Sequence, residues 1–239
     1  MSFTRKIIHK SIDELTTVAN MAFSLDGVYI LHETLGVKSV EGWNPKNNNG
    51  VVGILFIKDD HKIVVALEDA PEDLPWSNEG GLINQPIEEL EDLEDAESDF
   101  NGEMYCQKLN SPDFPAAYYC KTYNKGGRSW YLPSSGELRL IYKHLDEIQN
   151  ALSIVEGQKL VTTWAEGAPV YWSSTEYSAA CAWGLYLNNG DLYNWNDKVI
   201  HSGNVRPVSN FRKKNTLRES FTKKISSKKN NPDWFLCFP

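Results

Sequence analysis

The chain has 239 residues, of which 41% are hydrophobic and 23% are charged, so its composition is that of a globular protein with enough chain for one large or two small domains. A formal net charge of −8 and a pI near 5.2 argue against a general nucleic-acid binder, which is usually basic.

No segment approaches the roughly 20 apolar residues of a membrane span. The N-terminus, Met1–Asn20, contains no apolar signal-peptide core, so we expect a soluble chain, cytoplasmic as synthesised. Virion association or surface display is left open.

Residues 1–50 are predicted to form an N-terminal appendage. Ser11 and Glu14 have the spacing of a capping box, which predicts a short helix. The segment from Gly27 to Leu35 then has the composition of a strand. A polar loop precedes residue 51, where the main domain is expected to begin.

The main domain, residues 51–211, opens with the clearest strand pair of the chain. Two apolar runs, 51–57 and 62–67, flank the polar turn from Lys58 to His61. Because the runs are continuously apolar rather than alternating, they predict strands that are covered on both faces.

An acidic run follows at residues 88–99. Ile87, Leu90 and Leu93 recur every three residues, which favours a short helix with a solvated acidic face. A calcium site is the alternative, but calcium needs loop geometry and carbonyl ligands as well as carboxylates.

Two further helices are predicted downstream. The first spans 114–123 and ends at a pair of glycines. The second begins at Ser134, which forms a capping box with Glu137, and carries an apolar face over several turns. That face is formed by Leu138, Ile141, Tyr142, Leu145 and Ile148.

From Tyr171 onward the pattern changes to short strands and turns. The run 182–187 alternates, with Trp183, Leu185 and Leu187 on one face. The turn sequence at 188–191 predicts a hairpin, and 192–195 continues on the return strand.

The remaining features do not indicate catalysis or a cofactor. The cysteines Cys106, Cys120, Cys181 and Cys237 show no C-x-x-C spacing and could form two disulfides or none, and free thiols are the simpler interpretation. The five histidines are scattered, so no metal site can be inferred from spacing. The tail, 212–239, is basic and predicted to be flexible; a nucleic-acid or membrane-surface tether is its alternative role.

Three stretches together resemble bacterial and phage C-type-lectin-fold domains, the group that shares its fold with formylglycine-generating enzymes. They are residues 130–138, residues 171–176, and the run from Trp183 through Gly190 to Arg206. The resemblance covers roughly residues 27–211. It implies an α+β fold with short antiparallel strands, two packed helices and a loop-rich ligand face.

A narrower resemblance is to the variable proteins of diversity-generating retroelements. In these proteins, error-prone copying at adenines changes AAY codons, whose products exclude Trp, Lys, Glu, Gln and Met. The resemblance implies a variable ligand-contact segment at about 177–204, on a scaffold of Trp172, Trp183, Leu185, Leu187, Gly190, Val205 and Arg206. The ligand-contact residues it implies are Tyr177, Ser178, Ala180, Cys181, Gly184, Tyr186, Asp191, Tyr193, Trp195, Asp197, His201, Ser202 and Asn204.

The candidate variable positions can be tested against the codon rule. They comprise the same contact residues without Tyr177 and Trp195, plus Val199, Ile200 and Gly203, and every one is an allowed product. Trp195 is not, so it is either fixed or encoded differently. Tyr, Ser, Gly and Asn give rigid amphipathic area and adaptable hydrogen bonding, the combination that antibody paratopes use.

The sequence therefore favours a non-catalytic binding protein with a diversified surface, whose ligand is a protein or a surface glycan. A fixed-specificity adhesin or fibre tip is the first alternative, and a formylglycine-generating-type enzyme is the second. The triplet 195–197 spells the Trp-Asn-Asp motif of calcium-dependent animal lectins, but the Glu-Pro-Asn or Gln-Pro-Asp loop that accompanies it there is missing. Homo-oligomerisation is left open.

Overall fold

The computed structural model describes residues 25–79, 87 and 89–211; the basic tail and the helix expected near Ser11 lie outside these described residues. The strands are β1 Gly27–His32, β2 Gly36–Ser39, β3 Val51–Lys58, β4 His61–Val65, β5 Leu74–Pro75, β6 Val170–Glu176, β7 Cys181–Tyr186, β8 Leu192–Asp197, β9 Ser202–Gly203 and β10 Val208–Asn210. The helices are the 3-10 helix η1 Pro45–Gly50 and the α-helices α3 Leu93–Glu97, α4 Gly102–Lys108, α5 Pro115–Thr122, α6 Ser135–Lys143 and α7 Leu145–Ile154.

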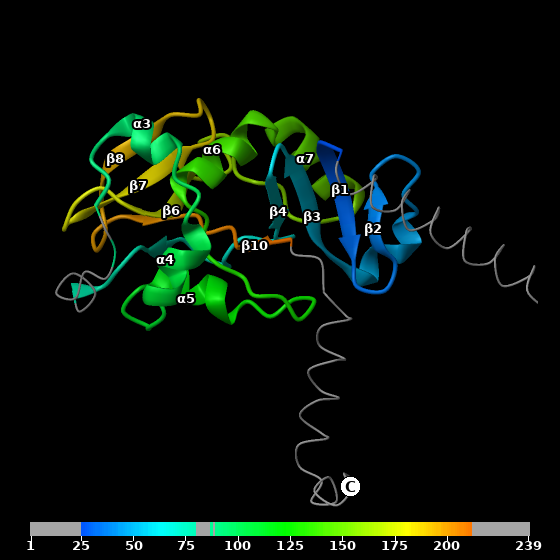
Figure 1. Cartoon of the computed structure of the whole chain (residues 1–239), viewed down its shortest axis with the longest axis horizontal. Coiled ribbons are helices and arrows are strands. Elements are labelled where there is room, and N and C mark those ends of the chain that lie inside the picture. The colour runs from blue at the N-terminus through cyan, green and yellow to red at the C-terminus, as the bar shows by residue number, and fades with distance from the viewer. Residues whose placement is uncertain (1–24, 80–86, 88, 212–239) are drawn as a thin grey trace, which may run out of the picture.

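A five-stranded antiparallel sheet, in the order β10-β4-β3-β1-β2, forms one end of the molecule (Figure 1). β3 and β4 are the predicted strand pair, and β3 is covered on both faces as expected. Ile54 and Phe56 point into the main core, whereas Leu55 and Ile57 join a second apolar cluster with Trp130.

β1 and β2, which the sequence analysis assigned to an N-terminal appendage, belong to this same sheet. Tyr29 of β1 pairs with Leu55 of β3, and Ile30 is fully buried in the main core. The expected boundary at residue 50 thus falls between β2 and β3, two strands of one sheet.

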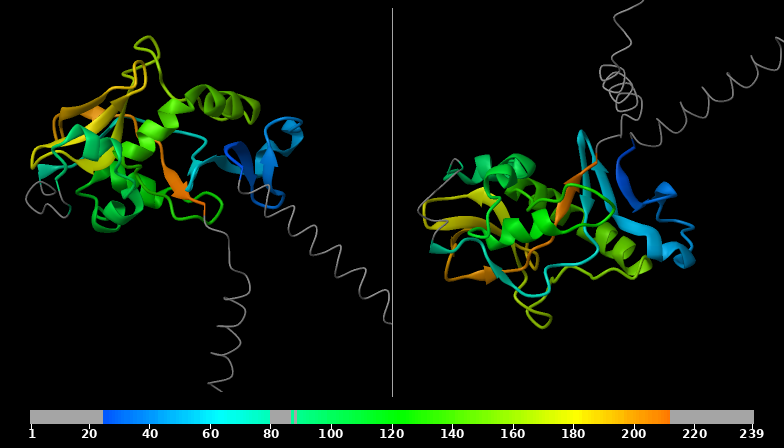
Figure 2. Two further views of the ribbon diagram at one scale, coloured as in Figure 1. Left: turned by 45° about the horizontal axis from the view of Figure 1, so that its top comes forward. Right: turned by 90° about the horizontal axis from the view of Figure 1, so that it is seen from below.

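A three-stranded sheet, β6-β7-β8, forms the other end, and the short pair β5-β9 lies beside it (Figure 2). β10 comes directly after this region in the chain but pairs with β4, with Val208 opposite Val65. An isolated bridge between Tyr131 and Val208 adds the segment after α5 to the same edge. The strands predicted at 182–187 and 192–195 are present as β7 and β8.

The helix predicted from Ser134 is present but is broken at His144. Its start is as expected: Glu137 Oε2 accepts from the backbone N–H of Ser134, 2.8 Å away, completing the capping box. α6 packs on β6 and β7, whereas α7 packs on β1 and β3. His144 leaves helical geometry, with φ −122° and ψ 25°, and its ring lies 4.7 Å from that of Phe56. The break lets the apolar faces of the two helices follow different sheets.

The acidic run contains a shorter helix than the sequence predicts. α3 starts at Leu93 after the N-cap Asp92, and Leu93 is half exposed. Ile87 is buried, and the backbone N–H of Leu90 donates to the carbonyl of Glu176, 2.9 Å away. The three-residue spacing of the apolar side chains thus reflects separate tertiary contacts.

The described part of the chain is an α+β fold, in agreement with the expected class. One large apolar core runs from Ile30 of β1 to Val208 of β10. Within the described ranges, no helix is both long enough and apolar enough to cross a membrane.

Candidate ligand surface

The predicted contact residues lie mainly on β7, β8 and the loops beside them. β7 is the central strand of its sheet, and β8 is an edge strand. The pairing of β7 with β8 shifts between Ala182 and Gly184, where β8 carries one extra residue. Such a bulge twists a strand and redirects its side chains. β7 and β8 therefore present an irregular surface on a rigid base.

The base below this surface is held by hydrogen bonds from buried tryptophans. Trp172 Nε1 donates to the carbonyl of Leu74, and Trp183 Nε1 donates to that of Leu90, both over 2.8 Å. Both indoles are only 2% exposed, which confirms their prediction as core residues. Because buried N–H groups are costly to leave unpaired, these bonds fix β6 and β7 against the loops that cover them.

A buried lysine anchors the loops at the other end of the surface. Lys198 Nζ donates to the backbone carbonyls of Ser178, over 2.7 Å, and of Ala179, over 3.2 Å. It also lies 3.3 Å from Glu176 Oε1 and 4.7 Å from the centre of the Trp76 ring. Burial lowers the pKa of Lys198 and raises that of Glu176, while the attraction between them opposes both shifts. Lys198 thus ties the 177–181 loop to the one that follows β8.

Asp197 and His201 shape the loop after β8. Asp197 Oδ1 accepts from the backbone N–H groups of Val199 and Ile200, each 2.9 Å away, and these bonds lower the pKa of the carboxyl group. The N–H of Asp197 donates to His201 Nδ1 over 2.8 Å. Both predicted contact residues therefore also maintain the turn, which leaves Ile200 79% exposed at its tip.

Three aromatic rings form what we term the aromatic platform: Trp164, Tyr186 and Tyr193. The rings of Tyr186 and Tyr193 meet edge to face with their centroids 4.7 Å apart. The ring of Trp164, from the loop before β6, lies 6.2 Å from Tyr186 and is 64% exposed. Exposed aromatic area next to polar backbone is typical of binding surfaces.

Most predicted contact residues are accessible. Ala180, Asp191, His201 and Ser202 are exposed, and Tyr177, Ser178, Cys181, Tyr186, Tyr193, Asp197 and Asn204 are partly buried. The side chain of Trp195 lies outside what the structure describes.

Gly184 and Asn204 are less available than the sequence suggests. Gly184 is buried, and a Cβ atom there would lie 2.8 Å from Asn196 Nδ2, so it cannot contact a ligand directly. Asn204 Nδ2 donates to the carbonyls of Ala168 and Val170, so its amide supports the loop instead.

Sequence reasoning missed two residues of this region. Trp164 lies outside the 177–204 segment, and its only signal is a tryptophan within a polar, glycine-containing loop. Lys198 lies inside the segment, but the sequence alone suggests an exposed charged residue there. Under the codon rule that the resemblance implies, lysine is not a product of AAY codons, and this exclusion is the signal that could have set Lys198 apart from its neighbours.

The cysteines of the described residues are free, and two of them are buried. No cluster of three or more His, Cys, Asp or Glu side chains in this part of the chain could hold a metal ion. Cys106 and Cys120 are buried free thiols; burial raises the pKa of Cys106 to about 12 and that of Cys120 well above its usual value. The reactive form of cysteine is the thiolate, so these two are poor nucleophiles.

Comparisons with known proteins find similarity at the level of the fold. No protein-family model matches the chain, and no curated protein matches it. Among solved structures, the chain is similar to one described as a fimbrial protein from Bacteroides ovatus ATCC 8483, with a TM-score of 0.55 and 16% identity. The alignment covers 78% of this chain and 49% of that protein, so this chain spans about half its length. At this identity the likeness concerns the fold alone.

Proposed function

We propose that the protein is a non-catalytic ligand- or receptor-binding protein with a C-type lectin fold, whose contact surface is formed by residues 177–204 together with Trp164. We further propose that this surface is diversified, as in the variable proteins of retroelements. The ligand would be a protein or a surface glycan.

The proposal rests on one observation, namely that the candidate variable positions and the expected scaffold positions differ in burial. Every candidate variable position is exposed or partly buried, except the two glycines Gly184 and Gly203. Every expected scaffold position is buried, including Trp172, Trp183 and Arg206. A segment whose exchangeable residues are accessible and whose fixed residues are buried can change specificity without losing its fold.

The test is to sequence the coding segment for residues 171–208 across sibling isolates, with a search nearby for a template repeat and a reverse transcriptase. We expect substitutions at the candidate positions, with Trp183, Gly190 and Lys198 unchanged. A uniform segment without a template would refute diversification.

A fixed-specificity adhesin is the second candidate function. The fimbrial neighbour favours it, because that protein shares the fold and its description places it among surface appendages. The two candidates predict different sequence variation but the same contact surface. Binding to intact cells by the wild-type chain, with loss in the Trp164→Ala variant, would support either.

A further inference from the structure

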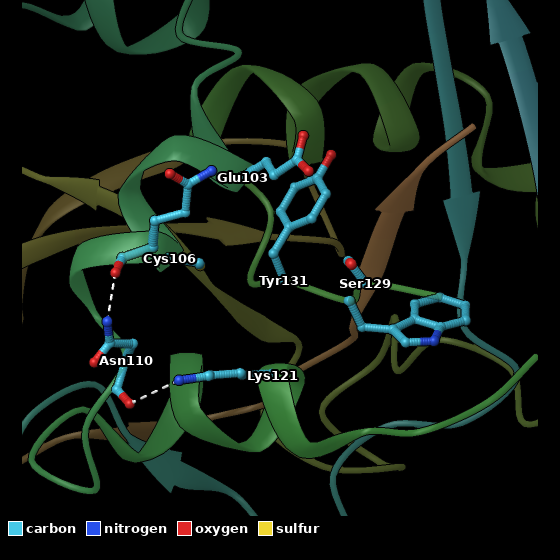
Figure 3. Close-up of a pocket in the computed structure, with 8 residues that line it drawn as sticks. Glu103, Cys106, Asn110, Lys121, Ser129 and Tyr131 are labelled. Carbon is cyan, nitrogen blue, oxygen red and sulfur yellow. Dashed lines mark hydrogen bonds between the residues drawn. The ribbon is translucent and has the colours of Figure 1, made fainter. Parts of the chain in front are cut away.

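A cavity of about 340 Å³ lies between α4, α5 and the segment 129–131, away from the proposed ligand surface (Figure 3). Polar groups at its rim bind one another: Asn110 Nδ2 donates to the carbonyl of Gln107, and Lys121 Nζ donates to the carbonyl of Asn110 over 3.3 Å. The cavity shares no lining residue with the 177–204 segment. That segment itself contains a single histidine, His201.

Two reciprocal hydrogen bonds join Asp197 and His201 and close the turn between them. The backbone N–H of His201 donates to the carbonyl of Asp197 over 3.2 Å, and the backbone N–H of Asp197 donates to His201 Nδ1 over 2.8 Å. Inside the turn, Asp197 Oδ1 accepts from the backbone N–H groups of Val199 and Ile200. Together these bonds hold Ile200, which is 79% exposed, at the tip of the 197–201 turn.

The bond to Nδ1 requires a neutral His201 ring. A ring nitrogen accepts a hydrogen bond only when it is unprotonated, whereas both nitrogens of an imidazolium ring are donors. Histidine side chains as a class change charge between about pH 5 and pH 8. The contribution of this bond to the turn is therefore present at pH 8 and is lost as the pH falls and His201 becomes protonated.

The groups around the turn do not replace the lost acceptor. The N–H of Lys198 donates to the carbonyl of Ala180 in the neighbouring strand, so the N–H of Asp197, one residue earlier, points away from β7. The Asp197 carboxylate attracts a protonated His201 ring, whereas the Lys198 ammonium group repels it and is itself held by Glu176. The titratable side chains of the adjoining elements are Cys181 opposite Asp197 in β7, Tyr177 before β7, and Glu79 and Asp113 beside the segment 75–78. Among the described residues, none of these side chains accepts from the Asp197 N–H.

We propose that His201 makes the ligand surface sensitive to pH: its neutral ring holds the 197–201 turn in the binding arrangement, and protonation releases the turn and weakens ligand binding. This inference rests on the proposed function, because it concerns the regulation of the same surface. Asp197, His201 and Ser202 are all predicted contact residues in or next to the turn, so a change in the turn moves several contacts at once.

The switch is tested without a ligand, by NMR on the full ¹⁵N-labelled chain. His201→Asn is the matched variant, because the Oδ1 atom of asparagine can accept from the Asp197 N–H at any pH. We expect the Asp197 amide to exchange with water equally fast in wild type and variant at pH 8. At pH 5 it should exchange roughly fivefold faster in wild type, the factor expected for the loss of one ordinary hydrogen bond.

Two other histidines define the controls. His144 Nδ1 lies 3.2 Å from Glu147 Oε2, and His144→Asn should leave the exchange of the Asp197 amide as in wild type. His32 Nδ1 accepts from the backbone N–H groups of Thr34 and Leu35 beside β1, so its titration affects wild type and His201→Asn alike. If the ratio of the two Asp197 exchange rates is the same at pH 8 and pH 5, the proposal is overturned.

Binding to intact cells at the two pH values relates the switch to function. Between pH 8 and pH 5, wild-type binding should fall roughly fivefold more than His201→Asn binding, a comparison that cancels any titration of the cell surface. An equal fall in both proteins overturns the proposed regulation even if the exchange rates differ. Absence of wild-type binding at both pH values contradicts the proposed function instead, and the exchange rates then decide alone whether His201 controls the turn.

Discussion

Lys198 Nζ lies 3.3 Å from Glu176 Oε1, and each of the two side chains is only 1% exposed. The pair joins the end of β6 to the loop after β8, and Lys198 also holds the carbonyls of Ser178 and Ala179. A charged residue in the middle of the proposed contact segment is thus a fixed part of the frame beneath it.

Replacing Lys198 should destabilise the fold strongly. The Lys198→Met variant leaves the Glu176 carboxylate buried without its partner, which costs about 3–5 kcal/mol in comparable pairs. Urea unfolding measures this loss. The control Lys143→Met, at an exposed lysine of α6, should stay within about 0.5 kcal/mol of wild type. Adding Glu176→Gln to Lys198→Met should restore part of the loss; equal stabilities for Lys198→Met and the control would contradict the structural role.

Glu137 should make stability depend on pH near neutrality. Burial raises the pKa of this carboxyl group from 4.5 to about 7, against the lowering effect of its hydrogen bonds from Ser134 and Tyr131. Because the folded pKa exceeds the unfolded one, the stabilising contribution is complete below pH 4.5 and is lost as pH rises through 7.

The matched variant Glu137→Gln cannot titrate and isolates this effect. The stability of wild type relative to the variant should fall by about 3 kcal/mol between pH 4.5 and pH values well above 7. Urea titrations of both proteins at several pH values measure it. A difference that does not change with pH would exclude a raised pKa at this position.

Replacing Arg206, even with lysine, should destabilise the fold. Its Nε lies 2.5 Å from Asp69 Oδ1, and its two terminal nitrogens donate to the carbonyls of Ala66 and Gln158 over 2.9–3.0 Å. A lysine ammonium group cannot reproduce the planar arrangement of hydrogen bonds that this guanidinium group makes. We expect Arg206→Lys to lose about 2 kcal/mol and Arg206→Met about 3–5 kcal/mol in thermal or urea unfolding. Wild-type stability in Arg206→Lys would show that the fork is dispensable.

Mutations at the proposed contact residues and at the buried residues beneath them should reduce stability by different amounts. Tyr193→Ser removes one ring of a partly buried aromatic pair and should cost about 1 kcal/mol. Trp183→Ala removes a buried indole and should cost about 3–5 kcal/mol. The same urea assay serves both variants. If Tyr193→Ser proved as damaging as Trp183→Ala, the platform would be part of the core, and its proposed exchangeability would fail.

Local chemistry made part of the fold predictable from the sequence. The β3–β4 turn and the Ser134–Glu137 capping box depend on neighbours in the chain, and both are present as expected. The helix break at His144 could not be predicted, because the apolar spacing continues across it and only the two sheets below force a change of direction. For the same reason, Ile87 and Leu90 resembled a helix face although their partners lie in other elements.

The candidate site is likewise only partly predictable from the sequence. Exposure of the 177–204 segment follows from its turn residues and mixed chemistry, and most of its predicted contacts are accessible. The burial of Lys198 and the contribution of Trp164 depend on side chains brought in from Glu176, Trp76 and Tyr186. The spacing of residues within one segment does not predict such contacts between distant parts of the chain.

The placement of β10 has a consequence for how the chain matures on the ribosome. Val208 pairs with Val65, so the edge of the first sheet stays open until the whole β6–β8 region has been synthesised. Until then β4 presents unpaired backbone groups, a known route to misassociation. A substitution in the β6–β8 region that delays the pairing of β10 would therefore prolong the exposure of the β4 edge and favour misassociation during folding.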